Sequence, residues 1–267
     1  RRTGYRTRSL LCVPLHGGNN EVLGVIQVIN SRSGSFSAED LELLTSVAGV
    51  VSIAIENAIT LRDADRQFLS LVEALAASID ARDTLTAGHS KRVAQIAVGI
   101  ARELGFAGAE VDVVSVAALL HDYGKIGIAD AVLKKDGKLD EHEYGHMKTH
   151  ASLTFGILDN IKFSRKYRNV PTIAASHHEA LDGSGYPSGL TAVQIPFMAK
   201  VLAVADVFEA LTADRHYRSG MDEAQAMAII EPGIGRKFEG RVVAALRQYL
   251  GNGGRAALAL AGPAEAA

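Results

Sequence analysis

The segment HDYGK, residues 121–125, places an imidazole, a carboxylate and an ammonium within five positions. It follows the strongly apolar run 111–120, whose composition is typical of a buried helix. Neighbouring side chains on a helix point about 100° apart, so one metal ion would not normally bind both His121 and Asp122. A carboxylate can, however, bridge two ions while the imidazole binds one. On a continuing helix Lys125 would share a face with His121, because they are four residues apart. An isolated His-Asp pair is a chance pair at a helix end at least as often as it is a metal site.

Other residues of the same chemistry recur in the same setting. Five of the nine histidines, and two aspartates, stand near the ends of apolar segments. A single buried histidine is usually a core residue whose hydrogen bonds are satisfied. Burying this many ionisable groups costs several kcal/mol each unless they are paired or bind metal. Imidazole and carboxylate ligands without thiolates suit manganese, iron or zinc. The sequence therefore predicts a metal centre built from His89, His121, Asp122, His150, His177, His178 and Asp206.

Composition restricts the class of protein. The 267 residues are 48% hydrophobic, which suits a globular protein, and the net charge of −2 gives no footprint for nucleic acid or an anionic membrane. The single cysteine, Cys12, excludes an intramolecular disulfide framework, and we expect it to be a small buried residue of a strand. We expect no apolar run to reach the roughly 18 residues of a membrane span. These observations predict a cytoplasmic protein.

The N-terminal residues predict a strand pair and a helix. Segments 8–15 and 21–30 read as strands joined by a tight turn at 17–20. Ser37, with Asp40 three residues on, predicts a helix start with a capping box. This stretch resembles the C-terminal half of a GAF domain, which implies an α/β sensor remnant over residues 1–57.

A heptad pattern follows in the predicted helix. Apolar positions alternate by four and three residues over four heptads, interrupted by Asp65. One interpretation is a parallel homodimer through the helix at 47–75, with 58–78 as a signalling coiled coil. The other is a long helix packed on its own domain. The positions of the seam are Val47, Val51, Ala54, Ala58, Leu61, Asp65, Phe68, Val72 and Leu75.

Residues 79–250 predict a mainly α, nearly all-helical domain. A Gly- and Pro-rich loop at 182–190 separates two of its helices, and the small-residue stretch 251–267 is expected to be disordered. The expected helices are 94–104, 111–121, 140–150, 172–178, 198–212 and 224–230, with a short apolar piece at 157–158.

The motifs of this domain occur in a specific order. ARDTLTAGHSKRV, LLHDYGKIGI, MKTHASLTFGIL, SHHEALDGSGYPSGL and ADVFEALTADRHYR follow one another between about residues 71 and 250. In this order they resemble the HD-GYP family, a branch of the HD phosphohydrolases. The resemblance implies an all-helical domain with two divalent metal ions, iron or manganese. It also implies hydrolysis of cyclic di-GMP to pGpG, in some members on to GMP.

The resemblance also assigns residue roles. His89, His121, Asp122 and Asp206 would hold one metal, and Asp122 would bridge to a second held by His150, His177 and His178. Catalytic roles fall to Asp122 and to Lys125, which would contact a non-bridging phosphate oxygen. Substrate contacts would come from Lys125, from Gly185, Tyr186 and Pro187 of the GYP loop, and from Arg215 and Arg218.

Arg215, Arg218 and Glu179 have alternative interpretations. Arg215 and Arg218 could instead be solvated charges at a helix end. Glu179 could orient a ligand histidine or face solvent. Leu85 stands where some members have a glutamate that binds a third metal, so we expect two metals.

Other functions are compatible with parts of this pattern. The enzyme could act on another cyclic dinucleotide or on a phosphomonoester, or the domain could be a catalytically silent sensor of cyclic dinucleotides or of a partner protein. A coiled-coil scaffold is a third alternative. Every identified metal position is filled, which favours an enzyme. By family resemblance, the GYP loop also implies GGDEF-type diguanylate cyclases as partners.

Overall fold

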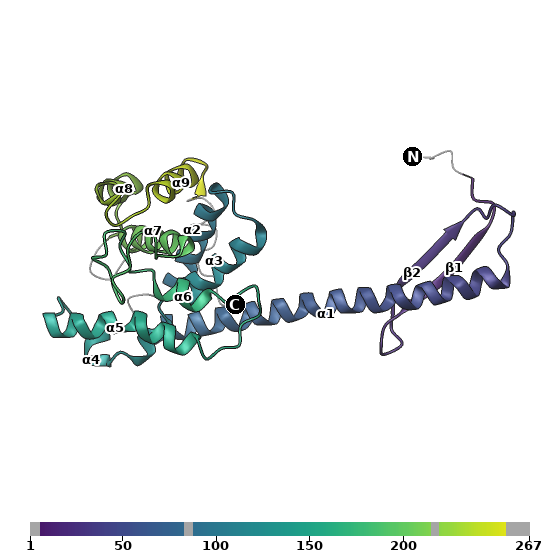
Figure 1. Ribbon diagram of the computed structural model, residues 1–267, viewed down its shortest axis with the longest axis horizontal. Coiled ribbons are helices and arrows are strands. Elements are labelled where there is room, and N and C mark those ends of the chain that lie inside the picture. The colour runs from purple at the N-terminus through teal and green to yellow at the C-terminus, as the bar shows by residue number, and fades with distance from the viewer. Residues whose placement is uncertain (1–5, 83–87, 215–218, 255–267) are drawn as a thin grey trace. The chain divides into compact units, whose positions relative to one another are not determined.

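The computed structural model describes residues 6–82, 88–214 and 219–254. The chain forms two compact units, Arg1–Phe68 and Leu69–Ala267. Figure 1 shows two strands in the first unit and a cluster of helices in the second. The mainly α fold with a small N-terminal α/β segment is confirmed.

The first unit packs a strand pair against a helix. Strands β1 (Leu10–His16) and β2 (Val22–Ile29) are antiparallel, and both lie within about two residues of their predicted bounds. Val13 and Leu15 pack with Leu44 and Ala48 of helix α1 (Ala38–Arg82). Cys12 faces the opposite side of the strand and is exposed. The prediction that it is buried is therefore wrong, because side chains alternate between the faces of a strand.

The predicted capping box starts helix α1. The hydroxyl of Ser37 and the carboxylate of Asp40 exchange hydrogen bonds with each other's backbone N–H groups, at 3.1 and 2.8 Å. These bonds satisfy N–H groups that have no partner inside the helix. From Val50 to its end at Arg82 the helix contains no Gly or Pro.

Helix α1 is long and apolar. By length and composition alone it could cross a membrane: its most apolar 18-residue window has a mean hydropathy of 1.6, and 17% of that window is buried. The expectation that no run reaches this length is wrong. Leu44 and Ala48 of the same helix nevertheless belong to the core of the strand pair, as in a soluble domain.

The positions of the heptad seam differ in burial along helix α1. Val72 is 3% exposed within the single chain, where it packs with the second unit, as do Ala76 and Ile79. The interpretation of Val72 as a contact between two chains is therefore wrong. Leu61, in the middle of the seam, is 70% exposed. Packing on the chain's own domain is thus seen at Val72, whereas dimerisation through the rest of the seam stays a prediction.

The second unit consists of helices around a core of small and branched apolar side chains. Helix α2 packs against α3, α7 and α9, and α5 packs against α6 and η1. The elements are α2 (His89–Glu103), α3 (Gly108–Leu120), η1 (Tyr123–Gly127), α4 (Asp130–Leu133), α5 (Glu141–Leu158), α6 (Val170–Ala175), α7 (Phe197–Thr212), α8 (Glu223–Ile230), η2 (Glu231–Gly233) and α9 (Gly240–Gly251).

Three helix ends differ from expectation. Helix α5 runs on to Leu158 rather than ending near His150, because its apolar face keeps packing. Helix α6 ends at Ala175, so His177 and His178 follow it. Helix α3 ends at Leu120 and is followed by the 3₁₀ turn η1, so Lys125 does not share a helical face with His121. The predicted disorder at 251–267 lies almost entirely outside the described residues.

The turn η1 lies directly on α5 because Gly124 has no side chain. A Cβ at Gly124 would lie 2.0 Å from the carbonyl oxygen of His150 and 2.4 Å from the backbone nitrogen of Thr154. The Thr154 hydroxyl accepts a hydrogen bond from Gly124 N–H at 2.8 Å and donates to the carbonyl of His121 at 3.0 Å. This contact sets the position of residues 121–125.

We predict that Gly124→Ala lowers the free energy of unfolding by about 1–3 kcal/mol, because the new methyl group meets backbone atoms that cannot rotate away. Urea denaturation followed by circular dichroism measures the change. The matched control is Gly145→Ala in the exposed part of α5, where a Cβ meets nothing within 4 Å. That substitution should stabilise by about 0.5–1 kcal/mol. Equal effects of both substitutions would contradict the close packing of η1.

Candidate metal centre

Three buried histidines are held by the same local hydrogen bond. The Nδ1–H of His121, His150 and His177 donates to the backbone carbonyl three residues earlier, at 2.7, 2.7 and 2.6 Å. Because Nδ1 carries the proton, Nε2 carries a lone pair. All three Nε2 atoms are buried, and none has a hydrogen-bond partner among the residues that the structure describes. Buried polar atoms normally have partners, so these lone pairs indicate ligands for a metal ion.

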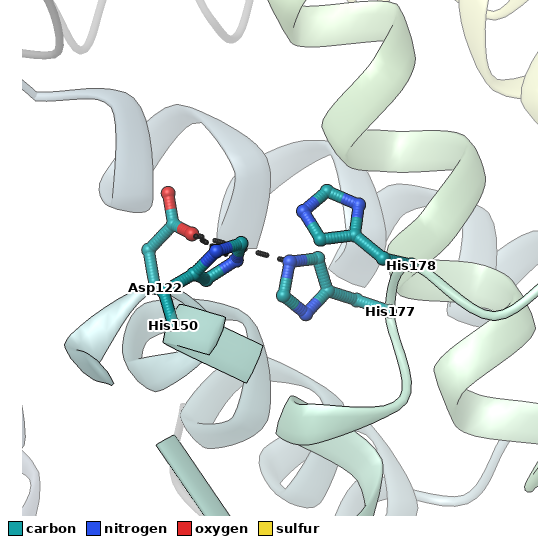
Figure 2. A group of neighbouring side chains, drawn as sticks. All are labelled: Asp122, His150, His177 and His178. Atoms are coloured by element: carbon teal, nitrogen blue, oxygen red, sulfur yellow. Dashed lines mark ion pairs between the residues drawn. The ribbon is translucent and has the colours of Figure 1, made fainter. Parts of the chain in front are cut away.

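The lone pairs converge on Asp122. Its Oδ1 lies 3.3 Å from Nε2 of His150 and 4.0 Å from Nε2 of His177, and Figure 2 shows both contacts beside His178. Its Oδ2 faces the other way, 3.4 Å from Nε2 of His121 and 3.8 Å from Nε2 of His89. One carboxylate therefore presents an oxygen to each of two groups of ligands.

Each group has the composition of a metal site. Within a group the ligand atoms lie within 4.8 Å of one another. The ligands are imidazoles and carboxylates without thiolates, a set that fits manganese, iron or zinc. One group is Asp122, His150, His177 and His178, and the other is His89, His121 and Asp206.

Glu209 completes the surroundings of His89. Its Oε2 lies 2.5 Å from His89 Nδ1, and its Oε1 accepts a hydrogen bond from Arg92 Nε at 2.5 Å. Nε2 of His89 then faces Asp206, at 3.3 Å. A carboxylate on the outer ring nitrogen fixes the ring and raises its basicity as a ligand. Sequence reasoning missed Glu209, although it lies three residues after Asp206 and so on the same face of α7.

The two groups differ in protonation. Burial lowers the pKa of His150, and it lowers that of His177 well below the usual value and that of His178 to about 4. Burial also acts to lower the pKa of His89, but hydrogen bonds to Asp206 and Glu209 outweigh it and raise this pKa to about 10. At neutral pH the first group is ready to bind a cation, whereas His89 must first lose a proton.

Lys125 lies against the shared carboxylate. Its Nζ is 2.7 Å from Asp122 Oδ2, and its side chain is 15% exposed. Burial acts to raise the pKa of Asp122, but the charges of Lys125 and the histidines hold it well below the usual value. Lys125 therefore brings a positive charge to the mouth of the site.

The loop at residues 182–190, which we call the DGSGYP loop, packs on His178. A Cβ at Gly185 would lie 2.5 Å from the carbonyl oxygen of His178, so only glycine fits there. The ring of Tyr186 lies over that of His178, with 4.6 Å between centroids, and Pro187 follows through a cis peptide. The loop thus forms one wall of the site.

Glu179 has a different role from either expectation. It is 5% exposed, and its two carboxylate oxygens accept hydrogen bonds from the backbone N–H groups of Ser188 and Leu190, at 2.7 and 2.8 Å. It therefore holds the DGSGYP loop in place, rather than orienting a ligand histidine or facing solvent.

A cavity of about 350 Å³ opens onto both groups of ligands. It is within the size range of small-molecule sites. Its wall includes His89, Asp122, Lys125, His150, His178, Tyr186 and Asp206. Arg215, Arg218 and Leu85 lie outside the described residues, so their expected roles stay predictions.

The chain matches known families over both units. The HD domain family matches residues 73–242, and the GAF domain family matches residues 1–55. The expectation of an HD-type domain after a GAF segment is thereby confirmed.

Curated relatives align with about two thirds of the chain. The "Cyclic di-GMP phosphodiesterase response regulator RpfG" of Xanthomonas campestris is 41% identical over 172 residues, which are 64% of this chain and 45% of that protein. The "3'3'-cGAMP-specific phosphodiesterase 3" of Vibrio cholerae is 39% identical over 180 residues, 67% of this chain and 38% of that protein. The chain thus spans less than half the length of these relatives.

Solved structures share the fold. The HD domain of the Listeria monocytogenes phosphodiesterase PgpH has a TM-score of 0.51 and 16% identity, covering 69% of this chain and 98% of that one. Bd1817, described as an HDG"Y"P protein from Bdellovibrio bacteriovorus, has a TM-score of 0.52 and 20% identity, covering 63% and 53%.

We predict that the two ligand groups bind metal with different pH dependence. At pH 7 a divalent ion at the group of His89 displaces about one proton, because the pKa of His89 is about 10. An ion at the group of His177 displaces almost none. Calorimetric titration of the metal-free protein with Mn²⁺, in two buffers of different ionisation enthalpy, measures the protons released in each step.

Glu209→Gln provides the matched variant. It removes a charge that raises the pKa of His89, so proton release should fall and metal affinity at this group should drop about 10–100-fold. Glu73→Gln, on the exposed side of α1, should change neither quantity. Equal proton release at both groups would contradict the assigned protonation.

Proposed function

The chain belongs to the HD domain family, and on that premise we propose that residues 69–254 form a two-metal phosphodiesterase that hydrolyses a cyclic dinucleotide. The observation that carries the proposal is the pair of ligand groups joined by the two oxygens of Asp122. Paired metal sites that share a ligand are typical of enzymes that hydrolyse phosphate esters. The names of the relatives support a cyclic dinucleotide as substrate.

The residues divide the work as follows. His89, His121, Asp122 and Asp206 would hold one ion, and Asp122, His150, His177 and His178 the other, with iron or manganese as the first candidates. When bound, such ions make water nucleophilic at neutral pH and offset the charge on the phosphoryl oxygens. Lys125, fixed on Asp122, would hold a non-bridging phosphate oxygen and stabilise the added negative charge.

The substrate has two candidates. Cyclic di-GMP, cleaved to pGpG, is supported by the intact DGSGYP loop and by the Xanthomonas relative. A mixed cyclic dinucleotide, 3'3'-cGAMP, is supported by a Vibrio relative of similar identity. Substrate contacts from Gly185, Tyr186 and Pro187 are supported in either case by Tyr186, which lines the cavity.

We also propose that the protein is a cytoplasmic dimer regulated through its GAF segment. The α1 seam supports this, because two of its apolar positions, Val47 and Leu61, are 41% and 70% exposed. Multi-angle light scattering of the parent and of Leu61→Glu should give a dimer and a monomer; a monomeric parent would contradict the proposal. Contact with GGDEF-type diguanylate cyclases rests on the family resemblance alone.

We predict turnover of cyclic di-GMP or 3'3'-cGAMP after anaerobic reconstitution with Fe²⁺ or Mn²⁺, measured by chromatography of the products. Cyclic di-GMP should give pGpG, or GMP if hydrolysis continues. The double variant His121→Ala, Asp122→Ala should lose activity by at least about 10³-fold, because it removes a ligand of one ion and the shared ligand of both.

The control for the variant is its circular dichroism spectrum and its monomer-dimer state, which should match those of the parent. Turnover by the double variant would contradict the assigned site. A metal-loaded parent that binds a cyclic dinucleotide without cleaving it would instead support a silent sensor.

A further inference from the structure

A second cavity, of about 550 Å³, adjoins the metal centre. His178 and Tyr186 line both cavities, so the stacked pair of rings forms the partition between them. Helices α7 and α8 and the segment 232–238 provide the far wall. A ligand at the metal centre could extend past Tyr186 into this space.

The charges of the second cavity are mainly positive. Lys148, Arg236 and Lys237 line it, and the side chain of Arg236 is 78% exposed, 3.5 Å from Asp182. The carboxylate among the lining residues, that of Glu179, is buried and accepts hydrogen bonds from backbone N–H groups of the DGSGYP loop. A phosphate group would therefore meet three cations in this cavity.

Aromatic rings stand beside these cations. Tyr144, Tyr186 and Phe238 line the same cavity. Nζ of Lys148 lies 4.5 Å from the ring centroid of Tyr144 and 5.4 Å from that of Tyr186. Aromatic faces next to basic side chains bind the base and phosphate of nucleotides without strong dependence on the base.

We propose that this second cavity binds the half of the cyclic dinucleotide that is not attacked at the metal centre, with its phosphate on Arg236 and Lys237 and its base against the aromatic rings. This inference rests on the proposed function. A cyclic dinucleotide has two phosphates and two bases, so its second half needs a site beside the metals, and the second cavity is the space that adjoins them past Tyr186. Arg236 and Lys237 are then binding residues that select a dinucleotide over a smaller diester.

The experiment compares two substrates. Bis(p-nitrophenyl) phosphate is a diester too small to reach across the partition, whereas cyclic di-GMP and 3'3'-cGAMP can. We predict that the double variant Arg236→Ala, Lys237→Ala lowers the ratio of kcat/KM for the dinucleotide to kcat/KM for the small diester by about tenfold or more, mainly through KM. Lys237→Ala alone, at an exposed position, should give a smaller change in the same direction.

The matched control is Arg247→Ala, an exposed arginine of α9 that lines a different cavity. It should leave the ratio within about twofold of the parent. An unchanged ratio in the double variant overturns the second cavity as a subsite, while the proposed function stands. A parent that cleaves the small diester but neither dinucleotide overturns the substrate class itself.

Discussion

The fold of the second unit is organised around buried imidazole lone pairs that no group in the described part of the chain satisfies. The Nδ1–H groups of His121, His150 and His177 are fixed on carbonyls of their own turns, so the rings cannot rotate to relieve their Nε2 atoms. Such an arrangement is costly without a cation. The surrounding packing holds it in place. Gly124 of η1 lies against α5, and Thr154 of α5 hydrogen-bonds to that turn. Gly185 of the DGSGYP loop lies against the backbone of residues 178–180.

Asp122 turns two groups of ligands into one centre. It follows the end of α3, where the chain leaves the helix, so its carboxylate can lie between histidines from three other segments rather than beside His121 alone. Lys125 reaches the same oxygen that faces His89 and His121. The charge that would act on a substrate phosphate and the carboxylate that would join the ions are thus positioned by one short turn.

The sequence predicted most of this because the chemistry is carried by residue types that are rare in cores. The ligand histidines and aspartates stand at the ends of apolar runs, and the structure brings all seven together. What it could not predict depends on tertiary packing. The 3₁₀ turn replaced a continuing helix because η1 packs on α5, Glu209 became a partner of His89 from a distant helix, and Glu179 became the anchor of a loop. The prediction that Cys12 is buried was wrong because the side chains of a strand alternate between its two faces, and Cys12 lies on the exposed one.

The most direct test of the central claim is anomalous diffraction from crystals of the protein reconstituted with Mn²⁺. Two anomalous peaks about 3.5–4 Å apart are expected. One should lie on the Oδ1 side of Asp122, beside His150, His177 and His178, and the other on the Oδ2 side, beside His89, His121 and Asp206. A single peak, or two peaks that do not share Asp122, would contradict a centre joined by this carboxylate.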